Sequence, residues 1–301
     1  MSSMDSLKYL PPKVRGAGNR KKSTLKIVMT LLVRDEVDII LSFLKYHSKM
    51  GVDLILATDN GSIDGTTDVL KSFEGTGKIK IFHEPSRNYL QDIWVTEMAR
   101  RAYSDYNADW VINGDADEFF IPRSGNIKDT LAQVNNTDIL VVNRHDFVPI
   151  IRPEILAPPI EMTYRKKISL EWVSGKPITP KTIHRGFPDV IIGRGAHNVS
   201  SKYAKNISLL PKIETFHYPI RSFKQFKSKV DHVGSGRRKN KLSSSRYSCW
   251  YPLLQEGKLE DVYQEYLFDD KRIEQSLISG EIIEEHRLAS ILNISEKLKG
   301  S

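Results

Sequence analysis

The sequence contains almost no cysteine and no long apolar run. Its single cysteine, Cys249, excludes an internal disulfide and a cysteine-rich zinc module. No window of about 18 apolar residues occurs, which argues against a membrane-spanning helix. The first 26 residues lack the apolar stretch of a secretory signal. We therefore expect a cytoplasmic protein whose fold is stabilised by packing alone.

The composition is that of a folded chain. Hydrophobic residues make up 40% of the sequence and aromatic residues 9%, more than a disordered chain carries. A length of 301 residues is ample for a sizeable core and fits one large domain or two ordinary ones.

The net charge of +8 is unevenly distributed. Residues 1–26 hold 7 basic and 1 acidic residue, and residues 202–246 hold 12 basic and 2 acidic residues. The rest of the chain holds 26 basic and 34 acidic residues, so it is an acidic body with two basic segments. Those segments can contact an acidic substrate, a phosphate or the inner membrane face. The alternative is that they are solvated tails and loops.

Short apolar runs alternate with helix-period segments in the first half of the chain. The strands predicted from these runs are 25–33, 53–58, 78–82, 109–113 and 138–142. This alternation predicts an α/β fold with a mostly parallel sheet, whose ligands bind beyond the carboxyl ends of the strands. Prolines interrupt the pattern after residue 150, where we expect irregular strands and loops. A helix is predicted at 222–233, a mobile basic loop at 234–245 and helices at 259–298.

A group of carboxylates follows the fourth predicted strand. Asp115 and Asp117 are spaced i, i+2, so both can point to one place beyond the sheet edge, and Glu118 follows directly. Hard cations such as Mn²⁺ and Mg²⁺ prefer oxygen ligands and commonly share them with substrate phosphates. The pattern predicts a metal-assisted nucleotide-diphosphate site. The alternative is an Asp cluster that caps the next element.

A turn motif follows the second predicted strand. Asp59 can accept hydrogen bonds from a base or a ribose, and Gly61 lets the backbone approach a ligand. The alternative is an Asx-rich turn in which Asp64 caps a helix.

Three motifs together carry a family resemblance. Leu32-Val-Arg34-Asp-Glu36, Asp59-Asn-Gly-Ser-Ile-Asp-Gly-Thr66 and Asp115-Ala-Asp117-Glu118-Phe119 resemble family 2-type glycosyltransferases of the GT-A fold. His217-Tyr218 is similar to the late His-Tyr of the bacterial branch with an Asp-x-Asp-Glu-Phe box. The resemblance implies a Rossmann-like α/β fold with a mostly parallel sheet and a helical C-terminal extension.

The resemblance also implies an activity and a domain plan. The activity is metal-dependent transfer of a hexose from a nucleotide-sugar, a UDP-sugar, to a saccharide or lipid-linked saccharide, by an inverting single displacement. The plan has a basic tail (1–24), a GT-A domain (25–233) and a C-terminal extension (234–301). Within the GT-A domain, 25–145 is the nucleotide-binding half and 146–233 the acceptor half.

The resemblance and the residue types suggest a set of site residues. The candidates for binding the nucleotide are Leu32, Arg34, Asp59, Asn60, Gln91 and Asp115. The candidates for binding Mn²⁺ or Mg²⁺ are Asp115, Asp117 and His217, with His197 as an alternative. Lys181 and Arg221 are candidates for the diphosphate, and the general base is left open among Asp146, Asp189 and Glu214.

Two other readings compete with a glycosyltransferase. A nucleotidyltransferase of related fold usually opens with a Gly-rich phosphate loop, and Gly16-Ala-Gly18 lies before the first strand without that context. A non-catalytic nucleic-acid or polyanion-binding protein is the other reading. No helix-turn-helix, RNA-binding aromatic motif or zinc-finger spacing is visible, so we expect no nucleic-acid partner.

Overall fold

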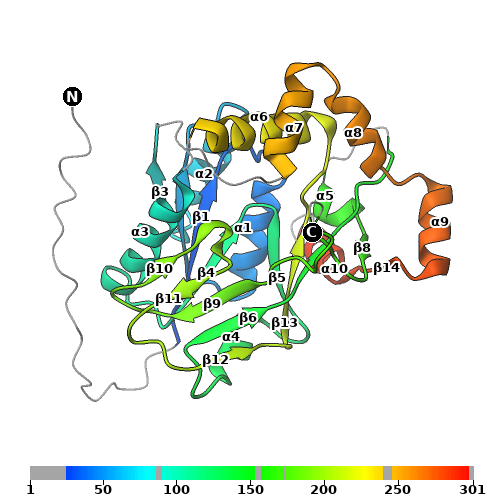
Figure 1. Ribbon diagram of the computed structural model, residues 1–301. Coiled ribbons are helices and arrows are strands. Elements are labelled where there is room, and N and C mark those ends of the chain that lie inside the picture. Colours follow the sequence, from blue (N-terminus) through cyan, green and yellow to red (C-terminus); the bar gives the residue numbers. More distant parts are fainter. Residues whose placement is uncertain (1–24, 86–89, 153–156, 172–173, 240–245, 298–301) are drawn as a thin grey trace, which may run out of the picture.

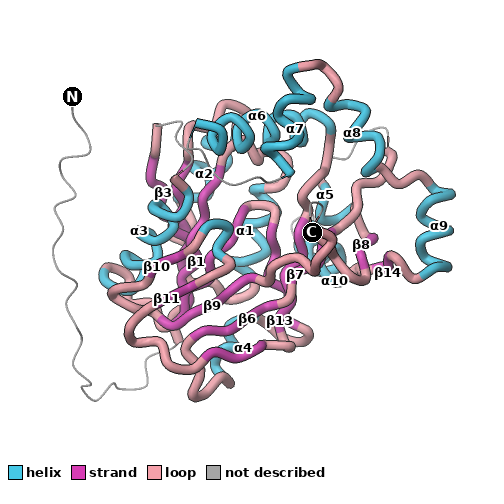
Figure 2. Tube along the Cα trace, in the orientation of Figure 1, coloured by secondary structure: helices cyan, strands magenta, loops and turns pink. Residues whose placement is uncertain are grey.

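The computed structural model describes residues 25–85, 90–152, 157–171, 174–239 and 246–297. The predicted tail at 1–24 lies outside this part of the chain. Strands and helices alternate through the first half, and helices cover both faces of a central sheet (Figures 1 and 2). The predicted α/β architecture is confirmed.

The central sheet has seven strands in the order β12-β6-β9-β4-β1-β2-β3. In chain order these are β1 (Ile27–Val33), β2 (Leu54–Asp59), β3 (Ile79–His83), β4 (Trp110–Asp115), β6 (Ile139–Val142), β9 (Lys181–Arg185) and β12 (Ile207–Leu209). Only β9 runs antiparallel to its neighbours in this sheet. The sheet is therefore mostly parallel, as the sequence predicts.

Successive side chains of β1 point to opposite faces of the sheet and contribute to the apolar core on each face. Met29 and Leu31 point to one face and pack with α1 (Ile40–Lys49). Val28 points to the other face and packs with α3 (Gln91–Ser104). A strand covered on both faces is apolar along its whole length, which is why this segment reads as a continuous apolar run. The shorter helices α2 (Thr66–Glu74) and α4 (Ile127–Ala132) complete this half.

A second sheet is built from three strands that are not among the strands predicted from the sequence. Its order is β5-β13-β7, made of β5 (Glu118–Pro122), β13 (Ile213–His217) and β7 (Arg144–Asp146). The register pairs His217 with Glu118 on one side and with Asp146 on the other. His217 thus lies next to residues about 70 to 100 positions earlier in the chain. It also lies close to the acidic box, which is Asp115, Asp117 and Glu118 at the end of β4 and the start of β5.

The remaining elements are short. They are α5 (Pro158–Glu161), β8 (Tyr164–Lys166), β10 (Ile191–Ile192), the 3₁₀ turn η1 (Arg194–Ala196), β11 (Val199–Ser200), α9 (Asp270–Ser279), β14 (Ile282–Glu284) and α10 (Arg287–Lys297). None of the helices in the described part of the chain combines the length and apolar character needed to cross a bilayer.

Three helices form a separate apolar cluster that lies over the upper edge of the central sheet (Figure 1). They are α6 (Phe223–Lys239), α7 (Arg246–Gln255) and α8 (Leu259–Tyr266). Their shared core contains Phe226, Val230 and Trp250.

The prediction of a mobile loop from residue 234 is wrong for 234–239, because α6 continues to Lys239. The glycine that suggested a loop lies instead where α6 crosses α7. A Cβ on Gly234 would lie 2.7 Å from Cβ of Tyr251 and 2.9 Å from the carbonyl oxygen of Tyr247. The remainder of the predicted loop, 240–245, lies outside the described residues.

This close crossing generates a stability prediction. Gly234→Ala should lower the free energy of unfolding by about 1–2 kcal/mol, because overpacking outweighs the better helix propensity of alanine. Urea denaturation measures the change. Gly75→Ala is the matched control, because a Cβ there meets nothing within 4 Å. Equal stability of the two variants would show that α6 and α7 do not cross as closely as described.

Candidate active site

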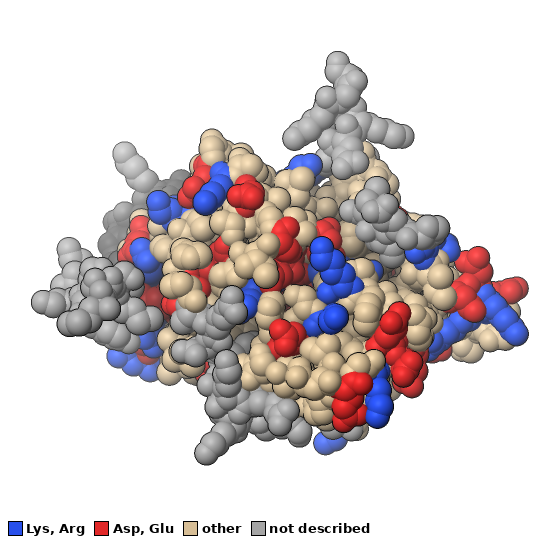
Figure 3. All heavy atoms as spheres, turned by 90° about the horizontal axis from the view of Figure 1, so that it is seen from above, with Lys and Arg blue, Asp and Glu red and all other residues tan. Residues whose placement is uncertain are grey.

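Parallel pairing brings the ends of three strands together. Val33 at the end of β1 pairs with Asp59 of β2, and Leu32 pairs with Asp115 of β4. A cavity of about 430 Å³ opens beyond this edge, and α6 and α7 supply its opposite wall. Figure 3 views the molecule from above and shows acidic side chains gathered near the middle of this face, with basic side chains beside them.

The acidic box lines the cavity, and its carboxylates pair with buried basic side chains. Asp115 accepts hydrogen bonds from Nζ of Lys181 at 3.0 Å and Nε2 of Gln91 at 3.2 Å. Nζ of Lys181 also lies 2.6 Å from Oε2 of Glu118. Burial alone would raise the pKa of Asp115, but the charge of Lys181 outweighs it and the pKa is lowered. Lys181 is fully buried and lies behind the box, outside the cavity lining.

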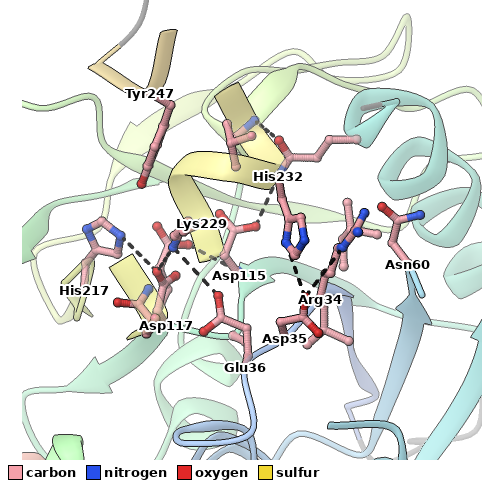
Figure 4. Close-up of a pocket in the computed structure, with 18 of the residues that line it drawn as sticks. Arg34, Asp35, Glu36, Asn60, Asp115, Asp117, His217, Lys229, His232 and Tyr247 are labelled. Atoms are coloured by element: carbon pink, nitrogen blue, oxygen red, sulfur yellow. Dashed lines mark hydrogen bonds and ion pairs between the residues drawn. The ribbon is translucent and has the colours of Figure 1, made fainter. Parts of the chain in front are cut away.

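Asp117 is buried and surrounded by positive charge (Figure 4). Its Oδ2 accepts a short hydrogen bond from Nζ of Lys229 and lies 3.6 Å from Nε2 of His217. Burial alone would raise the pKa of Asp117, yet Lys229 and His217 hold it well below its usual range. Asp117 is therefore ionised at neutral pH.

His217 bridges two carboxylates. Its Nδ1 donates to Oδ1 of Asp146 at 2.7 Å, while Nε2 faces Asp117. Burial would lower the pKa of His217, but the two carboxylates outweigh it and the pKa is raised. The same contact lowers the pKa of Asp146 to about 2, against the opposing effect of burial. The β5-β13-β7 register is the structural cause of this arrangement.

Arg221 lies behind the cavity wall rather than in its lining. Its guanidinium is fully buried and pairs with Glu36 and with Asp38, the latter at 2.7 Å. It also donates to the carbonyl oxygen of Tyr218 at 2.9 Å. Burial raises the pKa of Glu36 to about 6 in spite of this partner. In this structure Arg221 fixes the loop after β1 rather than facing a ligand.

Asp59 and Asn60, two predicted nucleotide contacts at the turn after β2, lie in different surroundings. Asp59 is fully buried, and its carboxylate accepts hydrogen bonds from Ser62 and from Oγ1 of Thr67. Asp59 therefore holds the turn and does not line the cavity, whereas Asn60 does. Leu32, Arg34 and Gln91 also line it.

Among the candidate bases and the alternative metal ligand, only His197 lines the cavity within the described residues. Asp189 accepts from Ser201 and Lys202, and Glu214 pairs with Arg123 and Arg287; neither carboxylate lines the cavity. Asp146 adjoins it through His217. His197 does line the cavity, and burial lowers its pKa to about 4, so it is neutral.

The late helices supply cavity residues that are not among the site residues listed from the sequence, although Lys229 lies in a basic segment expected to fold over the donor. Five cavity residues of α6 lie at helical spacing: Gln225, Ser228, Lys229, His232 and Val233. His232 reaches the loop after β1, with Nδ1 at 3.3 Å from Oδ2 of Asp35. Arg246 and Tyr247 come from the start of α7. The spacing of the α6 residues is that of one face of a helix. The neighbouring sequence, however, does not indicate which part of the protein this face contacts.

Comparisons with known proteins bear on the first half of the chain. Residues 28–147 match the sequence family Glycosyltransferase family 92. No curated protein was found to match the chain. The family match spans β1, β2 and β4, the strands whose ends border the cavity.

Solved structures of S. aureus TarS are among the similar folds. TarS 1-349 is 12% identical with a TM-score of 0.44, and its complex with UDP is 12% identical with a TM-score of 0.42. Each alignment covers 70% of this chain and 65% of the TarS chain.

The burial of Arg221 generates a second stability prediction. Arg221→Met should lower the free energy of unfolding by about 3–5 kcal/mol, because it leaves the carboxylates of Glu36 and Asp38 without their buried counter-charge. Arg123→Met is the control: it removes an ion pair whose arginine side chain is 60% exposed, and should change stability by less than about 1 kcal/mol. Chemical denaturation of both variants compares them. Similar small losses would mean that Arg221 does not carry this buried network.

Proposed function

We propose that the protein is a metal-dependent glycosyltransferase that moves a sugar from a nucleotide-sugar, a UDP-sugar, to a saccharide or lipid-linked saccharide. The observation that carries the proposal is the acidic box facing a cavity of about 430 Å³ beyond the parallel strands. This volume suits a small-molecule ligand, since such pockets span roughly 300–1,000 Å³. The family match over 28–147 includes the box and supports the same reaction class.

The lining suggests where the two ends of the donor lie. Leu32, Arg34 and Asn60 form the end of the cavity next to β1 and β2, which suits the nucleoside. Asp117, His217 and Lys229 lie at the other side of the acidic box, which suits the diphosphate. Lys229 replaces Arg221 in our assignment of the phosphate-facing cation, because Arg221 is buried behind the wall.

The residues around Asp117 fit a divalent cation. A histidine that donates Nδ1–H to a carboxylate and presents Nε2 is the usual form of a metal-binding histidine, and His217 does this with Asp146. Nε2 of His217 and Oδ2 of Asp117 are close enough to share one ion. The described residues contain no complete set of three or more protein ligands, so in this proposal Asp117 and His217 would hold the ion together with the donor phosphates. When bound, Mn²⁺ or Mg²⁺ stabilises charge on the leaving diphosphate.

The proposed reaction is a single displacement with inversion. The acceptor hydroxyl oxygen forms a bond to the anomeric carbon, and the bond from that carbon to the diphosphate oxygen breaks with its electron pair leaving on the diphosphate. Lys229 is placed to stabilise that charge. The hydroxyl proton passes to a base, and we assign Asp146, because it adjoins the cavity through His217, whereas Asp189 and Glu214 lie away from it.

We prefer this function to a polyanion-binding one. The described residues of the cavity face intermingle acidic and basic side chains (Figure 3), whereas a nucleic-acid surface is typically a basic patch.

The proposed function predicts metal-dependent binding of UDP. UDP at about 100 times its Kd should stabilise the protein by about 2.7 kcal/mol, seen as a rise of several degrees in Tm, and only when Mn²⁺ or Mg²⁺ is present. Asp117→Asn should abolish the metal-dependent part of this rise. Asp68→Asn, an exposed change on α2 away from the cavity, should leave it intact.

Two outcomes of this thermal-shift experiment would contradict the proposal. The first is an unchanged response in the Asp117 variant, which would remove Asp117 from the metal site. The second is a wild-type protein that UDP does not stabilise with either metal.

Replacing Asp146 separates its two roles. Asp146→Asn should lower metal affinity about 10- to 100-fold, because a neutral amide replaces the charged acceptor that orients His217 and raises its basicity. If Asp146 is also the base, kcat should remain at least about 100-fold lower at saturating Mn²⁺, with UDP still bound. The measurement is kcat against metal concentration. Full recovery of kcat with excess metal would leave Asp146 as a positioning residue alone.

A further inference from the structure

A second cavity of about 240 Å³ lies beside the first. It is bounded by the strands that carry Asp146 and Lys166 and by the helices α7 to α9. Its lining residues are Asp146, Phe147, Val148, Pro149, Lys166, Leu170, Pro219, Ile220, Arg246, Glu265, Tyr266, Phe268 and Arg272.

The two cavities share a thin wall. Arg246 lines both of them. Asp146 lines the second cavity and is bonded to His217, which lines the first. Neighbouring residues also divide between them, with Leu170 in the second cavity and Glu171 in the first. A ligand in the second cavity therefore lies across Asp146 from the proposed donor diphosphate.

The floor of the second cavity is apolar and its polar rim is basic. Phe147, Val148, Ile220 and Phe268 are almost fully buried and form apolar walls. Lys166, Arg246 and Arg272 supply three positive charges, against two negative charges from Asp146 and Glu265.

The three cations differ in how firmly they are held. Arg272 donates to the carbonyl oxygens of Glu265 and Leu267 at 2.8 Å, so its role is largely structural. Lys166 makes a loose ion pair with Glu281 at 3.5 Å, between side chains that are 39% and 47% exposed.

Arg246 lies between the two cavities. Its guanidinium lies over the rings of Tyr247 and Trp250, 5.4 and 5.9 Å away. Burial would lower the pKa of Arg246, but nearby groups that include the carboxylates of Asp146 and Glu171 outweigh it and the pKa is raised. A guanidinium can bind a carboxylate or a phosphate through two parallel hydrogen bonds, so Arg246 is suited to an anionic group of a ligand.

We propose that the second cavity binds the acceptor sugar, and that this sugar carries an anionic group, a carboxylate or a phosphate, held by Arg246 and Lys166. The proposal rests on the proposed function and names the acceptor class for the same site. The small volume suits one sugar ring, whose apolar face can lie against the apolar wall. A hydroxyl of that ring then meets the donor at Asp146.

The test uses small probes on the full chain loaded with UDP and Mn²⁺. D-glucuronate, glucose 6-phosphate and neutral methyl glucoside are compared by ligand-observed NMR titration, and the first two probes distinguish a carboxylate from a phosphate. At least one acidic probe should bind about tenfold or more tightly than methyl glucoside. Lys166→Gln should remove most of that advantage and leave UDP affinity unchanged, since Lys166 lines only the second cavity.

Glu281→Gln is the matched control. It breaks the same Lys166–Glu281 ion pair but leaves the ammonium in place, so binding of the acidic probe should persist. Tm values of both variants check that they fold alike.

Three results would overturn the inference while leaving the proposed function intact. They are equal binding of the acidic and neutral probes, acidic probes that compete with UDP, and an acidic preference unaffected by Lys166→Gln. Failure of UDP to bind the wild-type protein with Mn²⁺ would overturn the proposed function itself.

Discussion

The arrangement of the molecule depends on neutralising carboxylates that the sheet buries. Asp117 and Glu118 are each 1% exposed at the end of the central strands. Isolated charges in such a place are costly unless they are paired and hydrogen-bonded. Their partners come from distant parts of the chain, Lys181 on β9 and Lys229 on α6. The acidic box therefore requires the later chain to fold across the sheet edge.

This requirement explains the position of α6. Apolar contacts with α7 and α8 stabilise the helix, but they do not specify which part of the sheet it covers. Two polar contacts of the helix fix it there, Lys229 with Asp117 and His232 with Asp35, and Arg221, two residues before the helix, pairs with Asp38. Buried ion pairs contribute little net stability compared with apolar packing, and such pairs can instead specify a unique arrangement. Here that arrangement closes the cavity.

The sequence predicted the parts of the site that depend on local pattern. Leu32, Asn60 and Asp115 lie at the ends of apolar strands that the sequence pattern predicts. Parallel pairing of these strands is enough to predict that their ends lie together. The pairing of His217 with Asp146 could not be predicted, because it depends on the register of strands about 70 residues apart. The burial of Arg221 could not be predicted for the same reason, since its carboxylate partners lie more than 180 residues earlier.

The charges around the box bear on how a diphosphate can enter. Six carboxylates converge there, those of Glu36, Asp38, Asp115, Asp117, Glu118 and Asp146. Their permanent cations are four, Arg144, Lys181, Arg221 and Lys229, and a protonated His217 adds a fifth. Arg246 lines the same cavity and lowers the pKa of Asp146, so it adds a further positive charge and brings the cluster close to balance. In the proposed function a diphosphate would add negative charge to this poorly solvated cavity, and a divalent ion bound with it would offset part of that charge. An ion held by Asp117 would also leave Lys229 available to the phosphates.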